Sequence, residues 1–238
     1  MKHLYLLLSF LSILVVSCKE KSKEKSSLQN EQTKSFYFEV ETIVDGLEVP
    51  WSMAFLPDGS MLITEQKGEL IHFKNGIKTT IKDVPEVYFH GQGGLLDVEL
   101  DPNYGKNGWI YISYASNIEN DGKGGNTTIM RAKLNNFTLV EKEVLYKATP
   151  NTDRGAHFGS RIEFDREGYL YFSIGDRFDR DVNPQDITKD AGKIYRINSD
   201  GSIPTDNPFI NTENAKKAIF SYGHRNPQGM GIHPETGE

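Results

Sequence analysis

Three polar stretches of the chain carry the side chains best suited to chemistry. They combine histidine, arginine and amide groups with glycines more densely than ordinary turns require, and they are Phe89–Leu96, Arg154–Arg161 and Tyr222–Gly229. Each borders a run of strand-forming residues, so we expect the polar groups at strand-to-loop boundaries. A fold that gathers such boundaries at one end would make one site of the three stretches.

His157 is the candidate base of this site. Histidine suits proton abstraction near neutral pH because its unperturbed pKa lies close to neutrality. A single histidine is more often structural than catalytic, and the sequence by itself leaves both interpretations open. Gln92 lies between two glycines that allow a ligand to approach the backbone closely, although the same glycines could make only a tight turn.

The third stretch offers a set of hydrogen-bond donors. Arg225, Asn226 and Gln228 place a planar cation and two amides just before another strand-forming run. Guanidinium and amide N–H groups suit the binding of carboxylates or quinone oxygens. A capped loop with a surface arginine is the alternative interpretation.

A run of acidic and amide residues could supply oxygen ligands to calcium, which takes six to eight of them. The spacing of the run does not fit the EF-hand loop, so we favour a solvated loop over a metal site. The run consists of Asp176, Asp179, Asp181, Asn183 and Asp186.

The elements that must position these groups are short strands. Repeated units consist of a strand, a turn with Asp-Gly or an equivalent, and a second strand, at intervals of roughly 45 to 70 residues. The units are Met53–Thr64, Val98–Ser113 and Ile162–Ser173, and a fourth opens at Gly231–Gly237. Further strand candidates, expected on the outer side of each unit, are Gly68–Phe73, Thr127–Leu134 and Gly192–Ile197.

This self-similarity predicts an all-β fold, a β-propeller with four-stranded blades. A β-sandwich is the weaker alternative because the same turn phrase recurs at each unit. About three blades precede the opening of the fourth unit, so we expect the complete protein to continue for two to three further blades. We also expect this chain alone to be poorly stable, with an unpaired sheet edge.

Residues 1–18 have the pattern of a bacterial lipoprotein signal peptide. The apolar stretch Leu4–Val16 is shorter than the about 20 residues that a membrane-spanning helix needs. Small and aliphatic residues precede Cys18, the only cysteine, and resemble a lipobox. We expect export, lipidation of Cys18 and anchoring to a membrane, with Lys19 favouring the outer membrane. An ordinary secretory signal with a chance cysteine is the alternative.

Composition divides the rest of the chain into a tether and a globular part. Residues 19–35 are rich in Lys, Glu, Ser and Gln and cannot bury enough apolar surface to order themselves. Residues 36–238 are sufficient for one large domain, which has no cysteine and must be stabilised by core packing. The formal net charge of −6 argues against a nucleic-acid partner.

Five phrases in order resemble the glucose/sorbosone dehydrogenase family, and especially its aldose sugar dehydrogenase branch, which uses pyrroloquinoline quinone (PQQ). They span nearly all of the mature chain, and the last is quite specific. The phrases are Gly46–Trp51, Gly91–Asp97, His157–Arg161, Gly192–Arg196 and Gly223–Gly229.

The resemblance implies a six-bladed propeller with PQQ over the mouth of the channel. His157 would be the general base that removes the proton of the anomeric hydroxyl while the C1 hydride passes to the cofactor. Gln92, Arg225 and Asn226 would contact the quinone, and Asp176 would orient the histidine. Ala156 precedes the base where glucose-oxidising members have an aspartate, which indicates the branch of broader sugar specificity.

The family also implies calcium, held largely by backbone carbonyls in a Gly-Pro segment that we expect beyond residue 238. Arginines that clamp the carboxylates of PQQ are expected later still, so we expect this chain alone not to hold the cofactor. The leading hypothesis is an exported oxidoreductase that oxidises aldose sugars at C1 to lactones and passes electrons to an unidentified acceptor. The alternatives are a non-catalytic propeller that binds carbohydrate or protein, and a calcium-dependent sugar lactonase.

Overall fold

The computed structural model describes residues 38–118 and 122–237. It divides into two compact units, residues 1–42 and residues 43–238. In the first unit, the described residues 38–42 form neither helix nor strand. The predicted signal peptide, Cys18 and the whole of the predicted tether lie outside the described residues, so the lipid anchor stays a prediction. None of the described helices is both long and apolar enough to cross a membrane.

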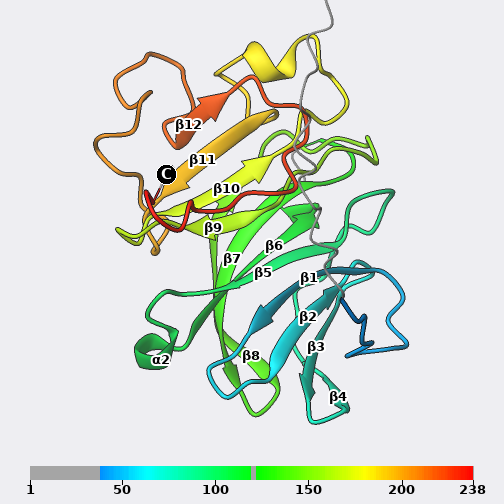
Figure 1. Ribbon diagram of the computed structural model, residues 1–238. Coiled ribbons are helices and arrows are strands. Elements are labelled where there is room, and N and C mark those ends of the chain that lie inside the picture. The colour runs from blue at the N-terminus through cyan, green and yellow to red at the C-terminus, as the bar shows by residue number, and fades with distance from the viewer. Residues whose placement is uncertain (1–37, 119–121, 238) are drawn as a thin grey trace, which may run out of the picture. The chain divides into compact units, whose positions relative to one another are not determined.

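The unit from residue 43 onward consists of antiparallel sheets (Figure 1). Three four-stranded sheets lie in the described residues, and each is made of four strands consecutive in the sequence. The first holds β1 (Pro50–Phe55), β2 (Met61–Glu65), β3 (Glu69–Lys74) and β4 (Ile77–Thr80). The second holds β5 (Leu95–Leu100), β6 (Trp109–Ser116), β7 (Asn126–Asn135) and β8 (Thr138–Lys147). The third holds β9 (Ile162–Phe164), β10 (Leu170–Ile174), β11 (Lys193–Ile197) and β12 (Ile219–Tyr222).

Helical structure is minor in the described part of the chain, and its main elements there are α2 (Tyr104–Asn107) and η2 (Asn183–Gln185). The predicted strand pairs are confirmed, because β1 pairs with β2, β5 with β6, and β9 with β10. The Asp-Gly turn between β1 and β2 closes with a hydrogen bond from the Gly59 N–H to the Leu56 carbonyl, 2.9 Å long. Gly59 has a φ of 79°, a conformation that glycine adopts without strain. Each sheet is therefore one propeller blade, as expected.

In the predicted opening of a fourth blade at Gly231–Gly237, the described residues contain the turn but no strand. The described residues from 223 to 237 form turns and irregular structure only. A strand needs a hydrogen-bonded neighbour, and no described segment pairs with this one. Only its turn is present, closed by a hydrogen bond from the Gly237 N–H to the His233 carbonyl.

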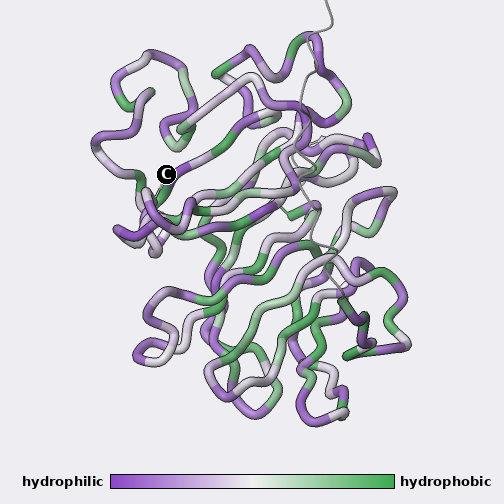
Figure 2. Tube along the Cα trace, viewed as in Figure 1, coloured by the Kyte–Doolittle hydropathy of each residue, from purple (hydrophilic) through white to green (hydrophobic). Residues whose placement is uncertain are grey.

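The second blade is buried on both faces, and this explains its continuous apolar sequence. Ile110 and Ile112 of β6 are fully buried in a cluster with Leu62 of the first blade. The intervening Tyr111 points to the opposite face and packs with Phe172 of the third blade. Figure 2 shows that hydrophobic stretches run through the sheets, whereas most connecting loops are hydrophilic.

A buried carboxylate joins the first strands of the three blades. Asp97 of β5 is 1% exposed, and its Oδ1 accepts hydrogen bonds from the Ser52 hydroxyl of β1 at 2.5 Å and from Arg161 Nη1 at 2.9 Å. Its Oδ2 accepts from the Ile162 N–H of β9 at 2.7 Å. The inner strands of all three blades are therefore tied to one side chain.

Asp190 joins the second and third blades farther out. This carboxylate is 1% exposed and accepts hydrogen bonds from the Tyr146 hydroxyl of β8 at 2.5 Å and the Tyr195 hydroxyl of β11 at 2.8 Å. The Lys216 ammonium lies 3.1 Å from its other oxygen. The interface between these blades thus has a polar tie as well as an apolar core.

We expect Asp97→Asn to lower the free energy of unfolding of the complete protein by about 3 kcal/mol, because it disrupts a buried hydrogen-bonded carboxylate that joins three blades. The matched control is Glu143→Gln, since Glu143 pairs with Arg131 but its side chain is 48% exposed. That control should cost less than about 1 kcal/mol. Urea unfolding midpoints measure both, and equal small shifts would contradict the role given to Asp97.

The Glu99 carboxyl makes stability depend on pH. Its burial raises its pKa from 4.5 to about 7, so the folded state binds this proton more tightly than the unfolded state does. Folding stability from this group is present below pH 4.5 and declines as the pH rises toward about 7. We expect Glu99→Gln to be more stable than the parent at pH 8 and no more stable at pH 4, as measured by thermal unfolding. A stability difference that does not change with pH would contradict this assignment.

Candidate active site

His157 lies in the loop that leads into β9 and has an uncommon backbone conformation. Its φ is 57°, in the left-handed region, and the residue is 8% exposed. Its backbone N–H donates a 2.8 Å hydrogen bond to Oε1 of Gln92, which lies in the loop before β5. A non-glycine residue in this region carries strain that its surroundings must offset, and such strain is concentrated at functional sites.

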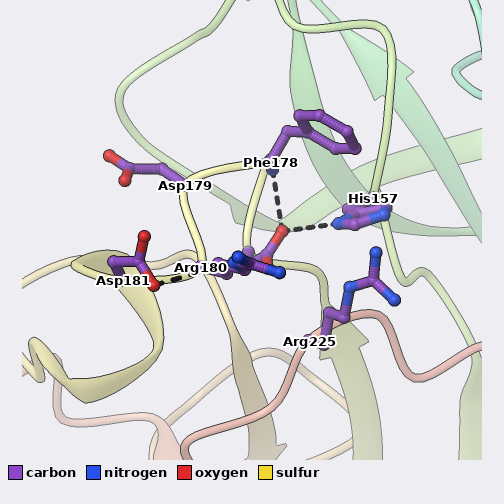
Figure 3. A pocket seen from close by; sticks show the side chains of 7 residues that line it. His157, Phe178, Asp179, Arg180, Asp181 and Arg225 are labelled. Carbon is purple, nitrogen blue, oxygen red and sulfur yellow. Dashed lines mark hydrogen bonds and ion pairs between the residues drawn. The ribbon is translucent and has the colours of Figure 1, made fainter.

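Asp176 holds the imidazole ring of His157. The carboxylate follows β10, is fully buried, and has Oδ1 2.6 Å from His157 Nδ1. An ionised carboxylate only accepts hydrogen bonds, so Nδ1 carries the proton and Nε2 is left as the basic nitrogen. The Phe178 N–H also donates to Oδ1 at 2.7 Å (Figure 3). The pair is therefore fixed in the tautomer that a general base needs.

The second oxygen of Asp176 has no hydrogen-bond partner among the described residues. A buried carboxylate with an unused acceptor is costly, and such groups are expected at functional sites. The buried Arg177 guanidinium interacts with its charge, and the carboxylate would stabilise the His157 imidazolium that forms when Nε2 takes up a proton.

The Arg225–Gln228 segment is fastened to this site through four consecutive residues. Arg225 accepts a 2.7 Å bond at its carbonyl from the Asp176 N–H, and Asn226 Oδ1 accepts from the Gly159 N–H at 3.0 Å. The carbonyls of Pro227 and Gln228 accept from Ser173 Oγ at 2.7 Å and from Arg161 Nε at 3.0 Å. The chain following β12 is thereby held beside the loop of His157.

His157, Asp176 and Arg225 line a cavity of about 190 Å³, whereas Gln92 and Asn226 are not among its lining residues. Figure 3 shows the Arg225 side chain extending to the side of His157, while Asp179 points away from it. The Arg225 guanidinium is exposed, and no hydrogen bond or ion pair of the described residues engages it. The cavity is lined by His157, Asp176, Phe178, Asp179, Arg180, Asp181 and Arg225.

The structure therefore brings all five predicted site residues together. Gln92 and Asn226 each use the amide oxygen to hold a backbone N–H of the His157 loop. Their –NH2 groups are the donors that they can offer to a ligand, and the Arg225 guanidinium adds charge-assisted donors. Cys18, the predicted lipidation site, lies outside the described residues.

Two functional candidates escaped the sequence analysis, Arg177 and Phe178. Arg177 is 1% exposed and lies under the loop that carries His157. The Phe178 ring is 57% exposed, and its centroid lies 5.0 Å from that of His157. Both have positive φ angles, 54° and 65°. Nothing in an Asp-Arg-Phe sequence indicates that the chain turns there and buries the arginine.

The acidic run does not converge into a metal centre. Within residues 38–118 and 122–237 no group of three or more His, Cys, Asp or Glu side chains is arranged to hold a metal ion. Asp186 instead forms a local turn by accepting hydrogen bonds from the N–H and hydroxyl of Thr188, at 3.0 and 2.6 Å.

Comparison with known proteins places this geometry in a family. The chain is 42% identical over 200 residues to the aldose sugar dehydrogenase YliI of Escherichia coli K12, covering 82% of this chain and 53% of that protein. The chain thus spans about half the length of the curated relatives it matches.

Solved structures agree with this match. The apo form of soluble aldose sugar dehydrogenase from Escherichia coli superposes with a TM-score of 0.75 at 40% identity, over 79% of this chain and 55% of that one. The PQQ-bound aldose sugar dehydrogenase from Streptomyces coelicolor gives a TM-score of 0.67 at 29% identity, over 79% of this chain and 54% of that one. Because the family model for glucose/sorbosone dehydrogenases matches residues 47–238, which include the whole site, the chain belongs to the glucose/sorbosone dehydrogenase family.

Proposed function

We propose that the protein containing this chain oxidises aldose sugars at the C1 hydroxyl to lactones, with PQQ as the acceptor. The observation that carries this proposal is the buried His157–Asp176 pair, whose 2.6 Å contact leaves Nε2 as a base in a cavity that also contains Arg225. A sugar dehydrogenase needs such a base, since the hydroxyl proton must leave as C1 is oxidised.

The residues of the site fit the oxygen-rich, anionic character of PQQ. Arg225 offers a guanidinium that is not engaged by any described side chain, and Gln92 and Asn226 offer amide N–H groups. Donors of this kind bind carboxylate and quinone oxygens, and positive charge stabilises an acceptor that gains electrons. When bound, PQQ would supply the acceptor for the C1 hydride. The calcium predicted for the family would find its ligands beyond residue 238. The roles proposed for His157, Asp176 and Arg225 do not depend on it.

The chain's own residues then have separate tasks. His157 Nε2 accepts the proton of the anomeric hydroxyl, while Nδ1–H remains bonded to Asp176. The carboxylate balances the imidazolium charge and fixes the ring, as in other histidine–carboxylate pairs. Arg225 holds the acceptor side of the cavity, and Gln92 and Asn226 keep the loop of the base in place.

We further propose that the protein is exported, lipidated at Cys18 and anchored to a membrane, and that it delivers electrons to an acceptor still to be identified. The support is the apolar stretch and lipobox-like residues before Cys18 and the polar tether after it. A tether of this composition would let the domain stand off the membrane surface.

The function is tested with the complete protein, supplied with PQQ and calcium, by aldose-dependent reduction of an artificial dye. We expect His157→Ala to lower kcat by about 100- to 10,000-fold, because the base is lost while the donors of the site remain. PQQ binding, followed by absorbance titration, should be kept. The matched control is His72→Ala, since His72 bonds Ser60 within the first blade. Turnover by His157→Ala at the parental rate would refute the assignment.

Asp176→Asn should retain the fold and lose kcat by about 100- to 10,000-fold, because an amide neither fixes the Nδ1–H tautomer nor balances the imidazolium. The KM for the aldose should change less than kcat. Asp186→Asn serves as control, since Asp186 belongs to the same acidic run but its carboxylate contacts Thr188 and Lys189 rather than His157. Equal activities of the two variants would exclude a role for Asp176 in the chemistry.

A further inference from the structure

Arg177 is a buried cation whose hydrogen-bond partners are neutral oxygens, while the nearby Asp176 carboxylate favours its charge. Its guanidinium donates to the carbonyls of Ala156 at 2.5 Å, Arg154 at 2.6 Å and Gly125 at 3.3 Å, and to Thr152 Oγ1 at 3.2 Å. Its Cζ lies 3.4 Å from the centroid of the Phe158 ring. Burial lowers its pKa to about 10, so the group keeps its charge at neutral pH. A charge is costly in such a place unless its hydrogen bonds are kept.

One of these bonds reaches the peptide group directly before His157. The Ala156 carbonyl and the His157 N–H belong to the same peptide plane, which resists twisting. Arg177 holds its oxygen at 2.5 Å, and Gln92 Oε1 holds its N–H at 2.8 Å. Hydrogen bonds therefore hold both ends of this peptide plane, and they fix the direction in which the imidazole projects from the backbone.

These two hydrogen bonds offset the strain of the left-handed conformation of His157, which has a φ of 57°. Such a conformation costs on the order of 1–3 kcal/mol and persists only where the surroundings enforce it. Without the Arg177 bond, rotation of the peptide toward a relaxed conformation would swing the ring away from Asp176.

Three consecutive residues act on the same histidine. Asp176 bonds Nδ1, Arg177 bonds the preceding peptide oxygen, and Phe178 lies against the ring. We propose that Arg177 is a positioning residue for the base, which fixes the Ala156–His157 peptide so that Nε2 is aimed into the cavity. The kinetic part of this proposal rests on the proposed function, whereas the positioning itself is a statement about the His157 loop.

The test is Arg177→Ala in the complete protein, with rescue by guanidinium ion. Arg177 lines two cavities of about 310 and 230 Å³, which give a small ion access to the vacated space. We expect kcat to fall by about 10- to 100-fold, because small misplacements of a catalytic group have effects of this size. KM for the aldose should change less. Millimolar guanidinium should restore most of kcat, and neutral urea at the same concentration should restore less.

The matched control is Lys193→Met, which removes another buried cation. Lys193 is fully buried and donates to the carbonyls of Asn183 at 2.7 Å and Ala191 at 2.6 Å, in the neighbouring loop. It should lose stability without a guanidinium-dependent change in kcat. Arg177→Ala with parental kcat, or a loss of kcat that guanidinium leaves unchanged, would overturn the proposal.

A second measurement is independent of turnover. The Nδ1–H proton of His157 should give a protected resonance in nitrogen-15 histidine spectra, because it is bonded to a fully buried carboxylate. We expect this resonance to be lost in Arg177→Ala and to return with guanidinium. If the parent protein fails to oxidise aldoses, the proposed function fails while this measurement still decides the role of Arg177. A resonance that persists unchanged in Arg177→Ala would overturn that role.

Discussion

The buried carboxylate of Asp97 is the contact on which the architecture depends. The candidate site is assembled from loops of separate blades, so its geometry is only as well defined as the docking of those blades. Apolar packing between sheets is non-directional and would tolerate small slides. Hydrogen bonds from Ser52, Arg161 and Ile162 to one side chain fix the inner strands in position. The geometry of the candidate site therefore depends on how these inner strands are held together.

Polar side chains of the candidate site hold its backbone in place. Gln92 and Asn226 hold N–H groups of the His157 loop through their amide oxygens, and each retains an –NH2 group. Asp176 holds the ring of the base and, through its N–H, the carbonyl of Arg225. The His157 ring and the Arg225–Asn226 segment are therefore connected within one hydrogen-bonded network.

The sequence predicted the inner strands and the site residues better than it predicted the edges of the blades. The inner pairs are rich in strand-forming residues and carry an Asp-Gly turn or an equivalent, but β4, β8 and β12 were missed. β4 is largely exposed and β8 contains a charged, exposed middle, as suits strands at a sheet edge. Arg177 was missed because arginine beside aspartate normally indicates a solvated ion pair. Its burial follows from positive φ at two successive residues, which composition does not reveal. The family resemblance supplied the pairing of His157 with Asp176.

The Asp176–Phe178 tripeptide also bears on how such a site can diverge. Three adjacent residues contact the His157 ring at Nδ1, the peptide oxygen before His157, and the side of the ring. The position of His157 therefore depends on the spacing of these three residues in the sequence. Insertion or deletion of one residue here would displace all three contacts together, whereas the side chains of Arg180 and Asp181, which follow, are exposed and make none of them. Substitutions among the exposed residues after Phe178 would change the edge of the cavity. They would leave the contacts with His157 in place, provided that the length of the Asp176–Phe178 segment is kept.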